Sequence, residues 1–374
     1  MEHTLFKIFV LLSILSTNAQ VETTDNSAAT FQTILDKATA NTSGISMTII
    51  APNLHITWSG ASGFDSKTED KKLEANQPFR IASITKTFTA AAILRLVEME
   101  KLNINDPIET YISEEHKAIL SQDKYDCKKI TVKHCLQHTS GIFDYAVGNK
   151  DYLKTVIDNP KKHWTRTEQI QFAVDHGEPV GSPGKTFHYS DTGYVILGEI
   201  IEKLTNKGLA EAYKTLIDFD KIELTSTWLE SLEPAPKTSQ RYVRSYLNNT
   251  ETTNWDNSTD LYGGGGYFST TEDLAKFYQS LFNGDVFKKQ STLELMLSSN
   301  SITNQDRKAE AYRMGIREIK TPYGNGYMHD GFWGAATIYF PKYNATIAIN
   351  YVDNYNPNIM KEAFMTIVKL SKGK

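Results

Sequence analysis

Ser83 and Lys86 are the first pair of residues in this sequence whose types and spacing could do chemistry. A serine hydroxyl is a weak nucleophile until a nearby base takes its proton, and a lysine held away from water can act as that base. Residues 88–99, which follow directly, are mostly apolar and predict a buried helix. Side chains three apart share a helix face, so Lys86 would reach the Ser83 hydroxyl. The pair predicts a serine nucleophile at a helix N-terminus.

The Ser-x-x-Lys pattern is common, and this chain contains it four times, starting at Ser83, Ser121, Ser182 and Ser371. Only the first occurrence opens a long apolar helix. A serine that caps a helix, with a solvated lysine one turn later, is the structural alternative at each of them. The motif alone leaves catalysis and capping open at Ser83.

Three further segments place polar side chains at the start of predicted elements. Residues 133–145 follow a strand-like stretch, and residues 183–194, which include Tyr189 and Asp191, open another apolar helix. Residues 327–334, which include His329, lead into a C-terminal hairpin. Tyr189 lies 106 residues after Ser83, and His329 lies 140 residues after Tyr189.

With these segments in place, the sequence resembles the penicillin-recognising serine hydrolases, especially the branch of class C β-lactamases, DD-carboxypeptidases and esterases. Members carry Ser-x-x-Lys, then Tyr-x-Asn, then Lys/His-x-Gly on a strand, in that order. The resemblance covers nearly the whole chain after its N-terminal leader. It implies an α+β fold of the β-lactamase/transpeptidase type, with an antiparallel sheet flanked by helices and an inserted helical region.

Carried over position by position, the resemblance implies that Ser83 is the acylated nucleophile and Lys86 its proton acceptor. Tyr189 would pass a proton to the leaving group and, after acylation, help to activate water. No metal and no organic cofactor are implied.

The third motif would complete the site. The resemblance implies that His329 tunes Tyr189 electrostatically and closes the floor of the site. Gly331 would let the strand approach the substrate without a side chain in the way. The backbone N–H groups of Ser83 and Phe332 would form the oxyanion hole.

Two acidic residues depart from the family pattern. Asp191 stands where Tyr-x-Asn has an amide, and Asp330 stands where a hydroxyl is usual; a carboxylate accepts hydrogen bonds and cannot donate them. If both face the cleft, a like charge at ~4 Å costs about 4 kcal/mol in a surface-like dielectric. We therefore expect neutral or cationic acyl substrates to be preferred over substrates that end in a free carboxylate. In the alternative, Asp191 pairs with Lys86 and Asp330 points away, which leaves the specificity of the family intact. Arg313 or Arg317 could also still hold a substrate carboxylate.

Strands are predicted at both ends of the chain, and helices between them. In order, we expect a helix over residues 28–38, a hairpin of 45–50 and 55–58, a second hairpin of 335–340 and 345–352, and a closing helix after Pro357. The sheet must then be completed by distant segments. We expect one catalytic unit over residues 20–374, with an α/β region (about 25–82 plus 265–374) and a helical region (about 83–264).

Residues 1–19 have the order of a secretory signal peptide, with Lys7 ahead of an apolar stretch and cleavage expected after Ala19. The apolar stretch, residues 8–15, is too short to cross a bilayer, which takes about 20 residues. We therefore expect export to the periplasm or the cell exterior, with no stable membrane span.

Composition excludes several other classes of protein. The 374 residues carry 40 Lys+Arg against 44 Asp+Glu, a net charge of −4, so no basic surface predicts nucleic-acid binding. Two cysteines, Cys127 and Cys135, are too few for a disulfide scaffold, although a single bridge between them stays open. His134 and His138 lie four apart on a predicted helix, but no third ligand has zinc-site spacing, so packing is expected.

The function we expect is hydrolysis of an amide or ester of a small-molecule or peptide substrate through a Ser83 ester. A D-alanyl-D-alanine carboxypeptidase-like activity on peptidoglycan-derived peptides is the first hypothesis, and an esterase or a class C-like β-lactamase is the second. A non-catalytic protein that binds peptidoglycan fragments is the alternative from another class. The presence of Ser83, Lys86 and Tyr189 together argues against it.

Overall fold

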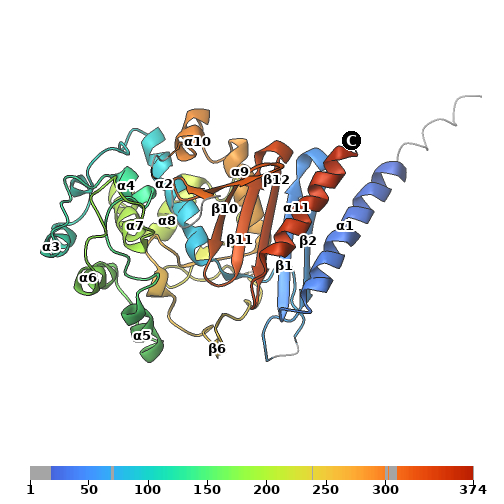
Figure 1. Cartoon of the computed structure of the whole chain (residues 1–374), viewed down its shortest axis with the longest axis horizontal. Helices are drawn as coiled ribbons and strands as arrows, with labels where there is room; N and C mark the ends of the chain where they lie inside the picture. Colours follow the sequence, from blue (N-terminus) through green and yellow to red (C-terminus); the bar gives the residue numbers. More distant parts are fainter. Residues whose placement is uncertain (1–17, 69–70, 238, 300–301, 303–309, 374) are drawn as a thin grey trace, which may run out of the picture.

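A seven-stranded antiparallel sheet forms one half of the molecule in the computed structural model, which describes residues 18–68, 71–237, 239–299, 302 and 310–373 (Figure 1). The strand order is β2-β1-β12-β11-β10-β9-β8. The strands are β1 (Gly44–Ala51), β2 (Ile56–Gly63), β8 (Glu310–Tyr312), β9 (Arg317–Thr321), β10 (Gly324–Gly331), β11 (Ala335–Phe340) and β12 (Ala345–Tyr351). β1 pairs with β12, with Ile45 opposite Tyr351, so the two ends of the chain share one sheet.

The two predicted hairpins are present. A 3-10 turn, η1 (Pro52–Leu54), joins β1 to β2, and another, η5 (Pro341–Tyr343), joins β11 to β12. Each turn ends at a residue with left-handed backbone, His55 and Asn344. Both β11 and β12 are buried along their whole length, which explains why their sequences are almost continuously apolar.

Helices cover both faces of the sheet. The first helix, α1 (Asn18–Ala38), and the last, α11 (Pro357–Lys372), lie together on the outer face (Figure 1). Phe364 of α11 stacks on Phe340 of β11, with ring centres 3.6 Å apart. On the opposite face, α9 (Thr271–Asn283) packs against β1, β11 and β12. Thr271 of α9 hydrogen-bonds Thr48 of β1 through their hydroxyl groups, at 2.9 Å.

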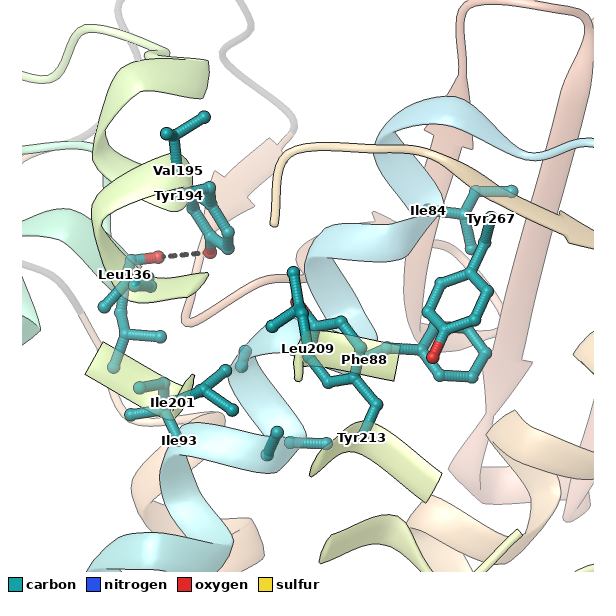
Figure 2. Close-up of a cluster of buried hydrophobic side chains, with 14 of the residues drawn as sticks. Ile84, Phe88, Ile93, Leu136, Tyr194, Val195, Ile201, Leu209, Tyr213 and Tyr267 are labelled. Carbon is teal, nitrogen blue, oxygen red and sulfur yellow. Dashed lines mark hydrogen bonds between the residues drawn. The ribbon is translucent and has the colours of Figure 1, made fainter. Parts of the chain in front are cut away.

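The other half of the molecule is mainly helical and is built around α2 (Thr85–Glu98). Every residue of α2 from 85 to 96 is buried, and α2 packs against α7 (Asp191–Thr205) and α8 (Leu209–Ile217). Figure 2 shows Phe88 of α2 beside Tyr267, with ring centres 5.0 Å apart. The remaining helices are α3 (Glu114–Gln122), α4 (Val132–Leu136), α5 (Lys150–Asp158), α6 (Arg166–His176) and α10 (Gln290–Met296).

Short strands connect the two halves. β7 (Tyr267–Ser269) lies between β3 (Phe79–Arg80) and β4 (Trp228–Leu229), so the segment before α2 is held by the segment before α9. A separate two-stranded pair consists of β5 (Tyr246–Leu247) and β6 (Thr250–Glu251). The fold is α+β, as predicted, while the region boundaries near residues 82 and 264 stay predictions.

The N-terminal leader lies mostly outside the described residues, because the description begins at Asn18, where α1 starts. Among the helices of the described residues, none combines the length and apolar character that crossing a membrane requires. Cys127 and Cys135 are both buried and both free, so the single bridge left open by the sequence does not form in this structure.

Candidate active site

Ser83 lies in a 3-10 turn, η2 (Ala82–Ile84), directly before α2. Ala82 has a backbone φ of 42°, in the left-handed region that non-glycine residues rarely adopt. Gly331 of β10 packs against this turn, and a Cβ there would lie 2.2 Å from the carbonyl oxygen of Ile81. The glycine therefore makes room for the backbone that carries the nucleophile, which differs from the expected role of making room for substrate.

Lys86 is fully buried, one turn into the predicted helix, and its ammonium group has three partners. Nζ donates to Ser83 Oγ at 3.0 Å and to the carbonyl oxygen of Gly264 at 2.8 Å, and it forms an ion pair with Asp191. A Cβ on Gly264 would lie 2.8 Å from Asp191 Oδ1, so a side chain there would press on this pair. The geometry brings Ser83, Lys86 and Asp191 together.

Asp191 is the first residue of α7, and its backbone is hydrogen-bonded to a second acid, Asp144. Its backbone N–H donates to Asp144 Oδ1 at 3.0 Å, and the Asp144 carboxylate also accepts from the backbone of Ala146 and Val147. Burial, and then the charge of Asp191, raise the pKa of Asp144 well above its usual value. Of the two arrangements open from sequence, the structure shows Asp191 paired with Lys86.

Tyr189 precedes α7 by two residues, and its ring faces two cations. Lys86 Nζ lies 4.9 Å from the ring centre and the Arg317 guanidinium carbon 5.8 Å from it. Burial, and then the charge of Asp191, raise the pKa of Tyr189 well above its usual value, while Arg317 and a hydrogen bond with Ser83 act in the opposite direction. Tyr189 is therefore a proton donor at neutral pH, close to the nucleophile.

His329, which was expected to tune Tyr189 electrostatically, is a neutral hydrogen-bonding residue in this structure. Its Nδ1 lies 2.8 Å from the Asp330 carbonyl oxygen, which can only accept, so Nδ1 donates and Nε2 accepts from the Tyr312 hydroxyl at 3.1 Å. Burial, and then Arg317, lower the pKa of His329 to about 3. The histidine is neutral and its ring centre is 6.5 Å from that of Tyr189, whereas the charge of Arg317 acts to lower the pKa of Tyr189.

His138 is a central residue of the site that the sequence reasoning treated as packing on a helix. α4 ends at Leu136, and His138 follows it with a left-handed backbone, φ 55°. Its ring centre lies 4.1 Å from that of Tyr189, and its Nδ1 accepts the backbone N–H of Ser190 at 3.1 Å. His138 therefore positions Tyr189. Within the described residues, no group of three His, Cys, Asp or Glu side chains could hold a metal ion.

A cavity of about 380 Å³ opens beside Ser83. Asp191, Phe332 and Trp333 border it, and its remaining lining is largely apolar, with Val147, Tyr152, Leu153, Val156, Leu247 and Trp255. No hydrogen bond among the described residues occupies the backbone N–H groups of Ser83 and Phe332, the pair expected to form the oxyanion hole. The volume suits a small acyl group.

Asp330 does not border this cavity, which matches the alternative in which it points away and not the hypothesis that it faces the cleft. Its carboxylate forms an ion pair with Arg317 and borders a separate groove between the sheet and α11. Arg313, the other arginine considered as a carboxylate clamp, pairs with Glu318. Both arginines are thus already bound to acids of the same chain.

The fold and the Ser83–Lys86 arrangement define a serine hydrolase of the β-lactamase type. A family model described as Beta-lactamase matches residues 31–370, and the chain belongs to that family. Penicillin-binding protein 4* of Bacillus subtilis is 27% identical over 308 residues, which are 78% of this chain and 62% of that protein. The chain therefore spans less than two thirds of that relative's length.

Two other relatives extend the comparison. Teichoic acid D-alanine hydrolase of Staphylococcus aureus is 25% identical over 328 residues, covering 86% of this chain and 74% of that protein. The structure of D-amino acid amidase from Ochrobactrum anthropi SV3 superposes with a TM-score of 0.78 at 22% identity, over 93% of this chain and 99% of the amidase. The amidase comparison supports the fold.

The Lys86–Asp191 pair yields a prediction about stability. Asp191→Asn removes the charged partner of a buried lysine and should lower the free energy of unfolding by about 3 kcal/mol. Asp330→Asn is the matched control, because its ion pair is partly exposed and should contribute less than about 1 kcal/mol. Both changes are measured by chemical denaturation at pH 7.5. Equal stability of Asp191→Asn and wild type would mean that Lys86 does not need the carboxylate.

His329 yields a prediction about pH. A folded-state pKa of about 3, against 6.5 for an ordinary histidine, means that only the unfolded chain binds this proton between those values. Stability attributable to neutral His329 is therefore complete above pH 6.5 and declines as the pH falls toward 3, by at most about 1.4 kcal/mol per unit. Denaturation of wild type and His329→Gln at pH 7.5, 6 and 5 should show a shallower decline for the variant. If the stabilities of wild type and His329→Gln declined in parallel as the pH falls, His329 would not be neutral in the folded protein.

Proposed function

We propose that this protein hydrolyses an amide or ester bond of a small acyl substrate through a Ser83 acyl-enzyme and releases a neutral leaving group. The observation that carries the proposal is the Ser83 hydroxyl, which is hydrogen-bonded to buried Lys86 at the edge of an apolar cavity. The family membership supports the same chemistry.

The proton of Ser83 needs a path when its oxygen attacks the substrate carbonyl carbon. Lys86 accepts a hydrogen from Ser83 only when its amine is neutral, and Asp191 is placed to hold the proton that Lys86 gives up. The tetrahedral oxyanion would lie between the N–H groups of Ser83 and Phe332, whose donors would need to come within about 3 Å of it.

Collapse of the tetrahedral intermediate breaks the bond to the leaving group, which takes a proton from Tyr189. The phenol is protonated at neutral pH, and its proton is replaced from the Lys86 side of the site. A water molecule then attacks the Ser83 ester, its proton returns along the same path, and the free acid and the serine hydroxyl are restored.

A neutral leaving group is favoured because Arg317, whose guanidinium lies 5.8 Å from the Tyr189 ring centre, already has an acid as partner. Arg317 forms an ion pair with Asp330, so a terminal carboxylate would have to displace that acid. The names of two relatives, a teichoic acid D-alanine hydrolase and a D-amino acid amidase, support a small D-aminoacyl group as the acyl part.

A carboxypeptidase acting on peptidoglycan-derived D-alanyl-D-alanine peptides is the second candidate. It is supported by the similarity to penicillin-binding protein 4* and by the position of Arg317, 5.8 Å from the Tyr189 ring centre. A β-lactamase would need the same accommodation of a carboxylate. A purely binding protein is disfavoured, because it has no need for a lysine hydrogen-bonded to Ser83.

The hydrolase that releases a neutral leaving group and the carboxypeptidase can be distinguished with one pair of substrates. These are N-acetyl-D-alanyl-D-alanine and its methyl ester at the terminal carboxyl. We expect the methyl ester to be cleaved at least tenfold faster at the D-alanyl-D-alanine amide bond, measured as kcat/KM, because the acid must compete with Asp330 for Arg317. Asp330→Asn should raise the rate on the free acid and narrow the difference, and Ser83→Ala should abolish both activities. Faster cleavage of the free acid by wild type would favour the carboxypeptidase.

We also propose that the protein is exported with removal of residues 1–19. The order of charged, apolar and small residues in the leader supports this. Expression of the full chain in a bacterial host should yield a protein that begins at Gln20 in the secreted or periplasmic fraction, as read by intact mass. An unprocessed chain found only in the cytoplasm would contradict the proposal.

A further inference from the structure

The cavity beside Ser83 carries charged residues besides Asp191, and most of them have partners. Arg80 donates to the backbone carbonyls of Thr252 and Trp255 and pairs with Glu230. Asp256 accepts the backbone N–H of Ser258. Arg80 and Asp256 therefore already have partners within the protein.

Lys150 and Asp260 are the other charged residues on this lining. Lys150 is exposed at the start of α5, on the solvent side. Asp260 differs from the paired residues and from exposed Lys150, because its Oδ1 is buried and has no hydrogen-bond partner among the described residues. A buried carboxylate oxygen without a donor costs free energy unless something else supplies the donor.

Contacts of two neighbouring residues fix the position of the Asp260 carboxyl at the cavity. Asp260 ends a 3-10 turn, η4 (Asn257–Asp260), and the carbonyl oxygen of the preceding Thr259 accepts hydrogen bonds from the hydroxyls of Tyr145 and Tyr152. A Cβ at Gly265 would lie 2.2 Å from Asp260 Oδ2, so glycine is needed there for this position of the carboxyl. The turn is thereby fixed from two sides.

We propose that Asp260 binds a primary ammonium group on the acyl part of the substrate, which makes the cavity a subsite for aminoacyl groups with a free amine. The inference rests on the proposed function and names its substrate class. Ser83 and Asp260 border the same cavity, so one small aminoacyl group could place its carbonyl carbon at Ser83 and its ammonium at Asp260. The apolar part of the same lining would contact the side chain of the amino acid.

The charges around the cavity agree with a cationic ligand. Burial, and then the charge of Asp191, raise the pKa of Asp260 to about 7, while Lys86 and Arg80 act in the opposite direction. An ammonium group bound at the carboxylate would compensate its negative charge, and a charge-assisted hydrogen bond is stronger than a neutral one. A substrate carbonyl at the same place would need Asp260 to be protonated, and this alternative can be tested separately.

Binding to a catalytically silent protein separates this inference from the question of hydrolysis. Calorimetry on Ser83→Ala would compare D-phenylalanine amide with 3-phenylpropionamide, which lacks only the ammonium group. We expect the amino acid amide to bind at least tenfold more tightly, and Ser83→Ala/Asp260→Asn to lose that preference while still binding 3-phenylpropionamide. Asparagine keeps the shape of the side chain and can donate a hydrogen bond to a carbonyl group. If Asp260→Asn loses the preference for D-phenylalanine amide, the negative charge of Asp260 therefore recognises the ammonium group.

The matched control is Ser83→Ala/Asp256→Asn, because Asp256 borders the same cavity but its carboxylate already accepts from the backbone. This variant should keep the preference for the amine. Equal affinity for both amides with Asp260 intact, or an undiminished preference after Asp260→Asn, would overturn the inference. If the preference is present and wild type hydrolyses neither amide, the subsite stands and the proposed hydrolysis fails.

Discussion

A lysine ammonium group held out of water is the constraint on which the rest of this structure depends. Lys86 is fully buried, and an isolated charge in that position would cost several kcal/mol. The Asp191 carboxylate, the Gly264 carbonyl and the Ser83 hydroxyl together compensate the burial. Each comes from a different part of the chain, so the site exists only when α2, α7 and the glycine-rich loop before β7 are assembled.

The sheet serves this assembly by holding the nucleophile turn in place. β10 brings Gly331 against Ile81, and β3, just before the turn, is paired with β7. Because β1 pairs with β12, the N-terminal segment that leads to Ser83 shares one sheet with the C-terminal strands. The strained backbone of Ala82 is a local cost that this surrounding structure sustains.

Much of the fold could be predicted from sequence because it follows from local pattern. The hairpins around Pro52 and Pro341 are fixed by turn residues between apolar strands, and the burial of α2 by its unbroken apolar run. Ser83 and Lys86 could be selected by type and spacing, and Tyr189 by the resemblance to a known family, and the structure brings the three together.

The electrostatics of the site could not be predicted in the same way, because they depend on burial and on contacts between distant segments. His329 was expected to tune Tyr189 electrostatically, and its neutral state follows from burial and the nearby Arg317, which lower its pKa. The pairing of Arg317 with Asp330, and the Asp260 oxygen that has no partner among the described residues, likewise arise from how the chain packs.

The most direct measurement of the central claim is the site of covalent modification by a labelled fluorophosphonate, read by intact mass and peptide mapping. The account predicts one label per chain, on Ser83, with no labelling of Ser83→Ala and labelling of Lys86→Met slowed by about a hundredfold or more. Labelling that persists in Ser83→Ala, or equal rates for wild type and Lys86→Met, would contradict the claim that Lys86 activates Ser83.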